Sequence, residues 1–168
     1  MNRALFLDRD GIFNKLVYFD DSPHSPRNWQ EVVHYPLHGL SDFRALGFNL
    51  ILVTNQPDIE RGFYSREFVD EVNAHYQLTH SLNAVYVCSF KSPDHPWKKP
   101  NPGMFLQAAQ DHDLDLSRSF HLGDTSNDLE AARRCGITPI LWDRPYNRSL
   151  RCENRVSSLA QVVAVLLH

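Results

Sequence analysis

Short, uninterrupted apolar runs recur along this chain of 168 residues, and amphipathic stretches separate them. Runs of this kind are typical of strands that are buried on both faces of a parallel sheet. We predict a central sheet of five strands. The predicted strands cover Arg3–Leu7, Leu50–Val53, Val85–Cys88, Ser119–Leu122 and Ile137–Trp142.

Helical periodicity fills much of the sequence between these strands. Leu40, Phe43 and Leu46 are spaced by three residues and precede Gly47, which predicts a helix over Leu37–Leu46. The other predicted helices are one that begins after the N-cap Ser65, one that opens with Asn101-Pro102 and runs to about Asp111, one over Ser126–Cys135, and a closing helix over Leu159–Leu166. Strands that alternate with helices predict a three-layer α/β fold with a central parallel sheet.

Two segments follow neither pattern. Ile12–Pro36 contains three prolines and several aromatic residues without a sustained period, and we predict a long, irregular excursion over the carboxyl end of the first strand. Asp143–Arg155 is polar and basic, which predicts a surface loop.

Length and composition narrow the class of protein. A chain of 168 residues fits one domain, predicted over residues 1–168. The formal net charge of −3 disfavours a nucleic-acid partner. Three cysteines at wide spacing form no disulfide framework and suit a reducing compartment, and no apolar run reaches the length of a membrane span. We therefore expect a soluble, cytoplasmic protein without a membrane partner.

Polar residues follow four of the predicted strands. Since the carboxyl ends of parallel strands meet at one rim of a sheet, these side chains are expected to lie together. Asp8 and Asp10 come directly after the first strand, and two such close carboxylates repel each other unless a cation, a shared proton or hydrogen bonds intervene. The other polar residues of the rim are Thr54 after the second strand, Lys99 after the third, and Asp124 with Asp128 after the fourth.

Phosphoryl transfer to a carboxylate fits this set of residues, because aspartyl phosphates are an established covalent route. A carboxylate nucleophile can approach a phosphoryl group only when the charge on that group is neutralised. Magnesium held by hard oxygen ligands would do this, Lys99 adds a point charge, and Thr54 and Asn55 can donate hydrogen bonds. A calcium loop that starts at the first aspartate is excluded, because its glycine and glutamate positions are Phe13 and Phe19.

The strand-end motifs resemble those of the haloacid dehalogenase (HAD) superfamily of phosphohydrolases in order and in spacing. The matching motifs are Asp8-Arg9-Asp10-Gly11, Thr54-Asn55, Lys99-Pro100, and Gly123-Asp124 with Asp128. Within this superfamily, the chain resembles the histidinol-phosphatase and heptose-bisphosphatase branch most specifically. The segments that carry this resemblance are Leu7–Gly11 with Asn14, Thr54-Asn55-Gln56 with Arg61-Gly62, and Lys99–Met104. The resemblance implies a Rossmann-like fold with the first strand in the middle of the sheet. About 45 residues separate each of the first three motifs, so we expect no inserted cap domain and an open site.

The resemblance also implies how the two leading aspartates share the chemistry. Asp8 would attack phosphorus, and Asp10 would protonate the leaving alkoxide and later act as base for the hydrolytic water. Asp8 must then be ionised while Asp10 holds a proton. We therefore expect their surroundings to push the two pKa values apart in that sense.

Ligands for metal and substrate are implied in the same way. Asp8, the backbone carbonyl of Asp10 and Asp124 would hold Mg²⁺, with Asp128 behind them as an auxiliary ligand. The residues expected to contact substrate are Thr54 and Lys99, on the phosphoryl oxygens, together with Asn55, Arg61 and Lys98.

Two of these basic residues have alternatives. Arg61 could touch substrate, or it could pair with Glu60 or Asp58. Lys98 stands where this branch often has an arginine that contacts substrate, and it could bind an anionic group only without the bidentate geometry of arginine.

The chain departs from its relatives in a segment that commonly binds zinc. Those relatives carry one Cys-x-His pair and one Cys-x-Cys pair, whereas here Cys88 is followed by Phe90, and the second pair reads His95 and Trp97. A structural zinc site needs four ligands, so we predict no zinc.

The function hypothesis is a Mg²⁺-dependent phosphomonoesterase that acts through an aspartyl phosphate. Its substrate would be a small phosphorylated metabolite, a sugar or polyol phosphate such as a heptose bisphosphate or histidinol phosphate. Three alternatives stay open at this point: a phosphatase that acts on nucleic-acid ends, a phosphotransferase, and a phospholigand-binding protein without catalysis.

Overall fold

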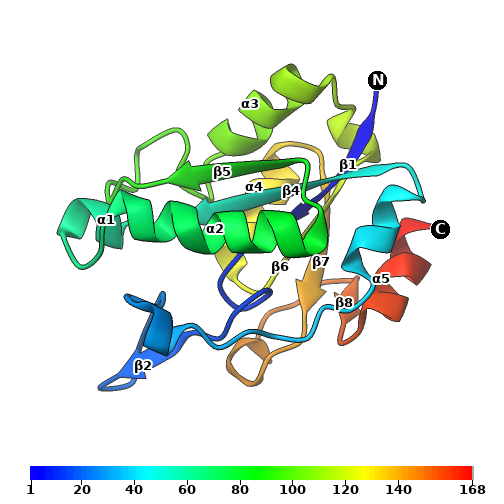
Figure 1. The fold of residues 1–168 in the computed structure, drawn as a ribbon. Helices are drawn as coiled ribbons and strands as arrows, with labels where there is room; N and C mark the ends of the chain where they lie inside the picture. The colour runs from blue at the N-terminus through cyan, green and yellow to red at the C-terminus, as the bar shows by residue number, and fades with distance from the viewer. Residues whose placement is uncertain (168) are drawn as a thin grey trace.

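The centre of the molecule is a six-stranded parallel sheet in this computed structural model, which describes residues 1–167 (Figure 1). Residue 168, the last residue of the predicted domain, lies outside the described residues. The sheet runs in the order β5 (Ala84–Cys88), β4 (Phe48–Asn55), β1 (Arg3–Leu7), β6 (Phe120–Gly123), β7 (Thr138–Trp142) and β8 (Arg155–Val156). The prediction of a parallel sheet with the first strand in its interior is confirmed, since β1 pairs with β4 on one side and β6 on the other.

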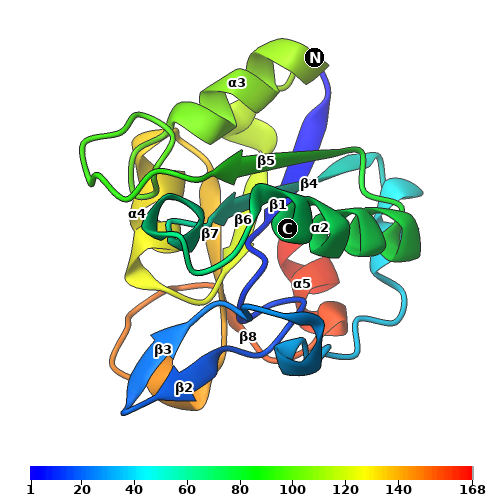
Figure 2. The same ribbon diagram turned by 60° about the vertical axis from the view of Figure 1, so that its left-hand side comes forward.

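Helices cover both faces of the sheet. Figure 2 shows the two helical layers on opposite sides of the strands. Alternate residues of β1 point to opposite faces. Leu5 and Leu7 belong to the apolar cluster under α2 (Arg66–His80) and α5 (Leu159–Leu166). Ala4 and Phe6 belong to the cluster under α3 (Gly103–His112) and α4 (Ser126–Arg134). The predicted three-layer α/β fold is therefore confirmed.

The helices α2, α4 and α5 begin after a residue whose side chain accepts a free N–H group of the first turn. The Oγ of Ser65 accepts the N–H of Phe68, which confirms Ser65 as the N-cap of α2. The predicted start of α3 is one residue too early: Pro102 is the N-cap and the helix begins at Gly103. Asn101 instead donates through its side chain to two carbonyls of the preceding loop, those of Pro93 and His95.

The predicted helix over Leu37–Leu46 was wrong. Only the short 3₁₀ helix η2 (Leu40–Arg44) forms there. Gly39 and Gly47 both have positive φ angles and bracket the segment, which leaves too little chain for a regular α-helix. A spacing of three is the period of a 3₁₀ helix, and Leu40 and Phe43 use it to reach the core.

The sheet has one strand more than predicted. Arg155 and Val156 form β8, which pairs in parallel with β7 at the end of the segment predicted to be a loop. Val156 is buried in the core. A strand of two residues is too short to show a hydrophobic period, which is why the sequence pattern did not reveal it.

The excursion after β1 contains more regular structure than predicted. It holds the hairpin β2 (Val17–Phe19) and β3 (Ser22–His24), followed by the 3₁₀ helix η1 (Trp29–Glu31). Its two turn residues, Asp20 and Asp21, have φ angles of 46° and 60°. Turns with two such residues suit the twist of a hairpin, and aspartate tolerates this conformation better than most residues.

A short helix, α1 (Asp58–Arg61), follows β4 and was not predicted. Among residues 1–167, no helix combines the length and the apolar composition that a membrane span requires.

Ser119 joins β1 to the segment before β6, and its removal should weaken the sheet. Its buried Oγ accepts the N–H of Ala4 at 3.0 Å and donates to the carbonyl of Asp115 at 2.7 Å. Ser119→Ala should lower the free energy of unfolding by about 1 to 3 kcal/mol, because a buried N–H loses its acceptor. Urea unfolding measures this. The exposed neighbour Ser117 is the control, and an equal loss in Ser117→Ala would contradict the assignment.

Candidate active site

The predicted polar residues meet at the carboxyl ends of the central strands. They line a cavity of about 280 Å³ that also reaches the hairpin and α1. The predicted residues that line it are Asp8, Asp10, Asn55, Arg61, Lys99, Asp124 and Asp128. Thr54 and Lys98 are outside this lining. Thr54 is buried beside it, whereas the ammonium of Lys98 donates to the carbonyl of Lys91 at 2.5 Å.

Gly11 allows the loop after β1 to pass close to the end of β6. Its φ angle is +89°, and a Cβ at this position would lie 2.0 Å from Oδ2 of Asp124. Any side chain here would therefore collide with Asp124. The Asp-x-Asp-Gly motif therefore requires glycine at its last position for a steric reason: only glycine lets the loop lie against the carboxylate that follows β6.

Lys99 is the buried cation of the site, with only 3% of its side chain exposed. Its ammonium donates to Oδ1 of Asp8 at 2.9 Å, to Oδ1 of Asp128 at 2.7 Å and to the carbonyl of Val53 at 3.0 Å. These contacts use all three of its protons. Burial alone would lower the pKa of Lys99, but attraction to Asp128 and Asp8 raises that pKa above its usual value, so the ammonium stays charged.

Asn55 fixes the backbone of Lys99. Its Oδ1 accepts the N–H of Lys99 at 3.0 Å, and its Nδ2 donates to the carbonyl of Lys99 at 3.0 Å. This pair of bonds ties the end of β4 to the loop after β5. The contact of Asn55 with substrate stays a prediction, and its contact with Lys99 makes it a residue that positions the cation.

Asp8 and Asp124 carry more negative charge than Lys99 can balance. Burial and the charge of Asp128 raise the pKa of Asp8 to about 7, against the opposing effect of Lys99. Burial and the charge of Asp8 raise the pKa of Asp124 well above its usual value. One oxygen of Asp124 accepts a hydrogen bond from the hydroxyl of Tyr146, and the other is buried without a partner among residues 1–167.

These carboxylates fit a divalent cation. Asp8, Asp124 and Asp128 each offer an oxygen, and the three oxygens lie within 4.8 Å of one another. Carboxylate oxygens are the donors preferred by hard divalent cations, and the partnerless oxygen of Asp124 would gain a ligand bond. Both oxygens of Asp128 are already engaged, one by Lys99 and His121 and the other by the main chain and hydroxyl of Thr125. Asp8 and Asp124 are therefore the more available donors.

Asp10 turns away from this acidic cluster, and its surroundings contradict the expected order of pKa values. Its carboxylate accepts from Arg9, from Asn14 at 2.8 Å, from Ser25 at 2.5 Å and from Gln56 at 2.9 Å. Burial would raise the pKa of Asp10, but the charge of Arg9 and the hydrogen bonds lower it. The two pKa values are indeed pushed apart, but the protein's own groups favour the proton on Asp8. The prediction overlooked the buried Arg9.

Several residues of the site were missed by the sequence interpretation. Gln56 links the first two motifs, because its amide donates to both Asp10 and Thr54 at 2.9 Å. Its place directly after Thr54-Asn55 was a signal that could have revealed it. Tyr146, which contacts Asp124, lies in the polar segment before β8, where the sequence carries no comparable signal.

Arg61 and the segment with the altered zinc motif also have defined places. Arg61 pairs with Asp58 at 3.0 Å, one of the alternatives left open, and it also lines the cavity. Cys88 is buried, and the ring of His95 stacks on Phe90 with ring centroids 3.9 Å apart. The absence of zinc from this segment stays a prediction.

Comparisons with known proteins agree with this geometry. Residues 96–155 match the HAD-hydrolase-like family model. The chain is 34% identical over 137 residues to the D-glycero-beta-D-manno-heptose-1,7-bisphosphate 7-phosphatase of Helicobacter pylori (strain J99), an alignment that covers 77% of this chain and 76% of that protein. It is also 34% identical over 176 residues to the D-glycero-alpha-D-manno-heptose-1,7-bisphosphate 7-phosphatase of Burkholderia mallei, with 88% and 84% covered.

Solved structures share the fold. The D,D-heptose 1,7-bisphosphate phosphatase from B. bronchiseptica, solved with magnesium and phosphate, superposes with a TM-score of 0.83 over 98% of both chains at 24% identity. A putative HAD-like phosphatase from Mesorhizobium loti superposes with a TM-score of 0.76 over 99% of this chain and 85% of that one, at 29% identity.

The buried contact between Lys99 and Asp128 leads to a prediction about stability. Lys99→Met leaves two buried carboxylates without their counter-charge and should lower the free energy of unfolding at pH 8 by about 3 kcal/mol or more. Asp128→Asn in the same chain should recover part of this loss, because a neutral amide needs no counter-charge. Urea unfolding of the single and double variants tests this coupling. The exposed Lys91→Met is the control, and additive effects of the two buried substitutions would refute the coupling.

Proposed function

This chain belongs to the haloacid dehalogenase (HAD) superfamily and is a phosphoric monoester hydrolase, and from that premise we propose that it removes one phosphate from a sugar bisphosphate with the help of Mg²⁺. The relatives that match most of its length are named as heptose-1,7-bisphosphate 7-phosphatases, which supports a substrate of that class. The observation that carries the proposal is the convergence of Asp8, Lys99 and Asp124 on one cavity at the carboxyl ends of the strands.

Asp8 is the proposed nucleophile. Lys99 holds one of its oxygens, and no hydrogen bond within residues 1–167 engages the other. The side chain lines the cavity, so a phosphate there can meet the second oxygen. Attack would form an aspartyl phosphate on Asp8 and release the sugar alkoxide, and water would then cleave the acyl phosphate.

Mg²⁺ is the proposed cofactor, held by Asp8, Asp124 and the backbone carbonyl of Asp10, with Asp128 behind them. A bound Mg²⁺ supplies positive charge that neutralises the transferred phosphoryl group. The excess of carboxylates over ammonium groups in the cavity supports this assignment. A structurally similar phosphatase was solved with magnesium and phosphate, which supports it further.

Asp10 is the proposed proton donor to the leaving oxygen. Its surroundings lower its pKa, so the proton must be favoured by the substrate itself. A phosphate dianion that enters beside Asp10 raises the pKa of this carboxyl, because a nearby negative charge disfavours ionisation. Gln56 and Asn14 hold the carboxyl in place through their amide groups, and Arg9 lies on its buried side.

The remaining site predictions are proposed in the same terms. Thr54, buried beside the cavity, and Lys99, by exchanging one of its present acceptors, would bind phosphoryl oxygens. Arg61 would contact the substrate from the edge of the cavity. We also propose that residues 1–168 act as one domain, since one apolar cluster contains both Leu5 of β1 and Leu166 of α5. The three cysteines are free, which fits the reducing conditions of the cytoplasm, the proposed location.

Asp8→Asn should abolish catalysis while it preserves the fold. The amide has nearly the same shape as the carboxylate but cannot attack phosphorus, so hydrolysis of an aryl phosphate with Mg²⁺ should fall by about three orders of magnitude or more. Circular dichroism and the unfolding midpoint check the fold. Activity within tenfold of the unsubstituted protein would refute the role of Asp8.

Mg²⁺ should stabilise the folded protein through Asp124. A cation that binds only the folded state raises the melting temperature as its concentration rises. Differential scanning calorimetry of chelator-treated protein measures this shift, and Asp124→Asn should lose most of it. Asp94→Asn removes an exposed carboxylate outside the site and should retain the shift. Equal shifts in all three proteins would place the cation elsewhere.

A further inference from the structure

Two arginines share a single carboxylate at the outer edge of the cavity. Asp58 begins α1, and 7% of its side chain is exposed. Oδ1 of Asp58 accepts from Arg61 at 3.0 Å, and Oδ2 accepts from Arg27 at 3.2 and 3.4 Å. One carboxylate balances one guanidinium, so this group of three residues carries a net charge of +1.

Arg27 reaches Asp58 from a segment far away in the sequence. It follows the hairpin β2–β3, and its guanidinium lies over the ring of Phe63 at 3.8 Å. The side chain of Glu31 accepts the main-chain N–H of Arg27 at 2.8 Å, which fixes this part of the excursion. Arg27 is thus held by three separate contacts, and its position is not that of a freely moving surface arginine.

Both guanidiniums keep donors available for another partner. Among the hydrogen bonds of residues 1–167, none uses Nη1 of Arg27 or Nε and Nη2 of Arg61. The side chains are 31% and 47% exposed. An arginine presents a planar fork that matches phosphate and carboxylate groups, so two partly free forks side by side suit an anion.

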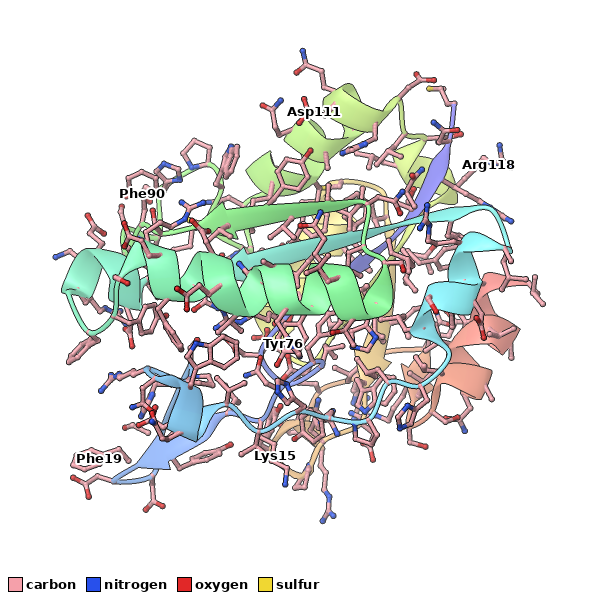
Figure 3. The ribbon with its side chains drawn as sticks, in the orientation of Figure 1. Lys15, Phe19, Tyr76, Phe90, Asp111 and Arg118 are labelled. Carbon is pink, nitrogen blue, oxygen red and sulfur yellow. The ribbon has the colours of Figure 1, made fainter. Side chains whose placement is uncertain are left out.

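The hollow that contains these arginines continues into the catalytic cavity. Arg27, Phe63 and Phe19 line its outer part, and Asp8 with Asp124 line the inner part. The residues that line both parts are Pro23, His24, Asp58 and Arg61. Figure 3 shows Phe19 at the outer end of the hairpin, beyond the ribbon of the sheet. The hollow therefore runs from a cluster of acids past Pro23 and His24 to a pair of arginines.

We propose that Arg27 and Arg61 form a second anion-binding subsite, which holds the far phosphate of a substrate whose near phosphate lies at Asp8. The inference rests on the proposed function and assigns the residues that bind the second phosphate of the sugar bisphosphate. Asp58 orients the two guanidiniums, and the carbon skeleton of the substrate passes Pro23 and His24, which line both parts of the hollow. Arg27 belongs to the hairpin segment, so this segment takes part in the choice of substrate.

A matched pair of substrates tests the subsite. D-glycero-D-manno-heptose 1,7-bisphosphate and D-glycero-D-manno-heptose 7-phosphate carry the same cleavable phosphate and differ only in the second one. The unsubstituted protein should have the higher kcat/KM for the bisphosphate. Arg27→Gln and Arg61→Gln should each reduce the ratio of the two kcat/KM values by about tenfold or more, as the loss of hydrogen bonds to a charged group does.

Arg66→Gln is the control for both substitutions. Arg66 is an exposed arginine on α2 that pairs with Asp70, and its variant should keep the ratio of the unsubstituted protein. A ratio within twofold of that value in both Arg27→Gln and Arg61→Gln would overturn the subsite. So would an unsubstituted protein that hydrolyses the two substrates equally well.

A binding measurement separates the subsite from the proposed reaction. In an Asp8→Asn background, calorimetry should show that Arg27→Gln weakens the binding of the bisphosphate by about tenfold. If the unsubstituted protein hydrolyses neither sugar phosphate while this loss of binding is observed, the proposed function is wrong and the subsite stands. Unchanged binding in Arg27→Gln and Arg61→Gln overturns the subsite, whatever the rate of hydrolysis.

Discussion

The buried ammonium of Lys99 is the interaction on which the rest of the site depends. It joins three elements that are distant in sequence, because it contacts Asp8 after β1, Val53 in β4 and Asp128 in α4. Burial raises the pKa values of Asp8 and Asp124, and repulsion among the acids raises them further, because a single positive charge does not balance these carboxylates. The same arrangement that holds the nucleophile therefore also creates a demand for a divalent cation.

Asp10 lies two positions after Asp8, but its carboxylate has different surroundings. Its carboxylate is surrounded by hydrogen-bond donors and by Arg9, so it is stable as an anion without a metal. Asp8, in contrast, faces other carboxylates. The two environments differ because Arg9, Asn14 and Gln56 donate to Asp10, whereas Asp124 and Asp128 lie beside Asp8. In the proposed reaction, the substrate's own charge then decides when Asp10 takes up a proton.

Much of the fold followed from the hydrophobic pattern, because long buried strands and capped helices leave a clear periodicity. Ser65 was predicted correctly as an N-cap for this reason, whereas the interior place of β1 was predicted partly from the family resemblance. The elements that were missed are short: η2 follows a period of three, and β8 has only two residues. The clustering of Lys99 with Asp8 was expected from their places at strand ends. Contacts such as that of Arg27 with Asp58 depend on how a hairpin docks, which no local pattern records.

The two ends of the hollow have opposite charge. The inner end is rich in carboxylates and the outer end holds two guanidiniums around one carboxylate, so a ligand is oriented by charge before any chemistry takes place. The central claim is that the inner end presents one oxygen of Asp8 to phosphorus.

A crystal structure with Mg²⁺ and beryllofluoride, which mimics an acyl phosphate, tests that claim most directly. We expect beryllium to be bonded to the oxygen of Asp8 that Lys99 does not hold, and Mg²⁺ to lie between Asp8 and Asp124. Beryllium on Asp10, or a magnesium site away from Asp124, would contradict it.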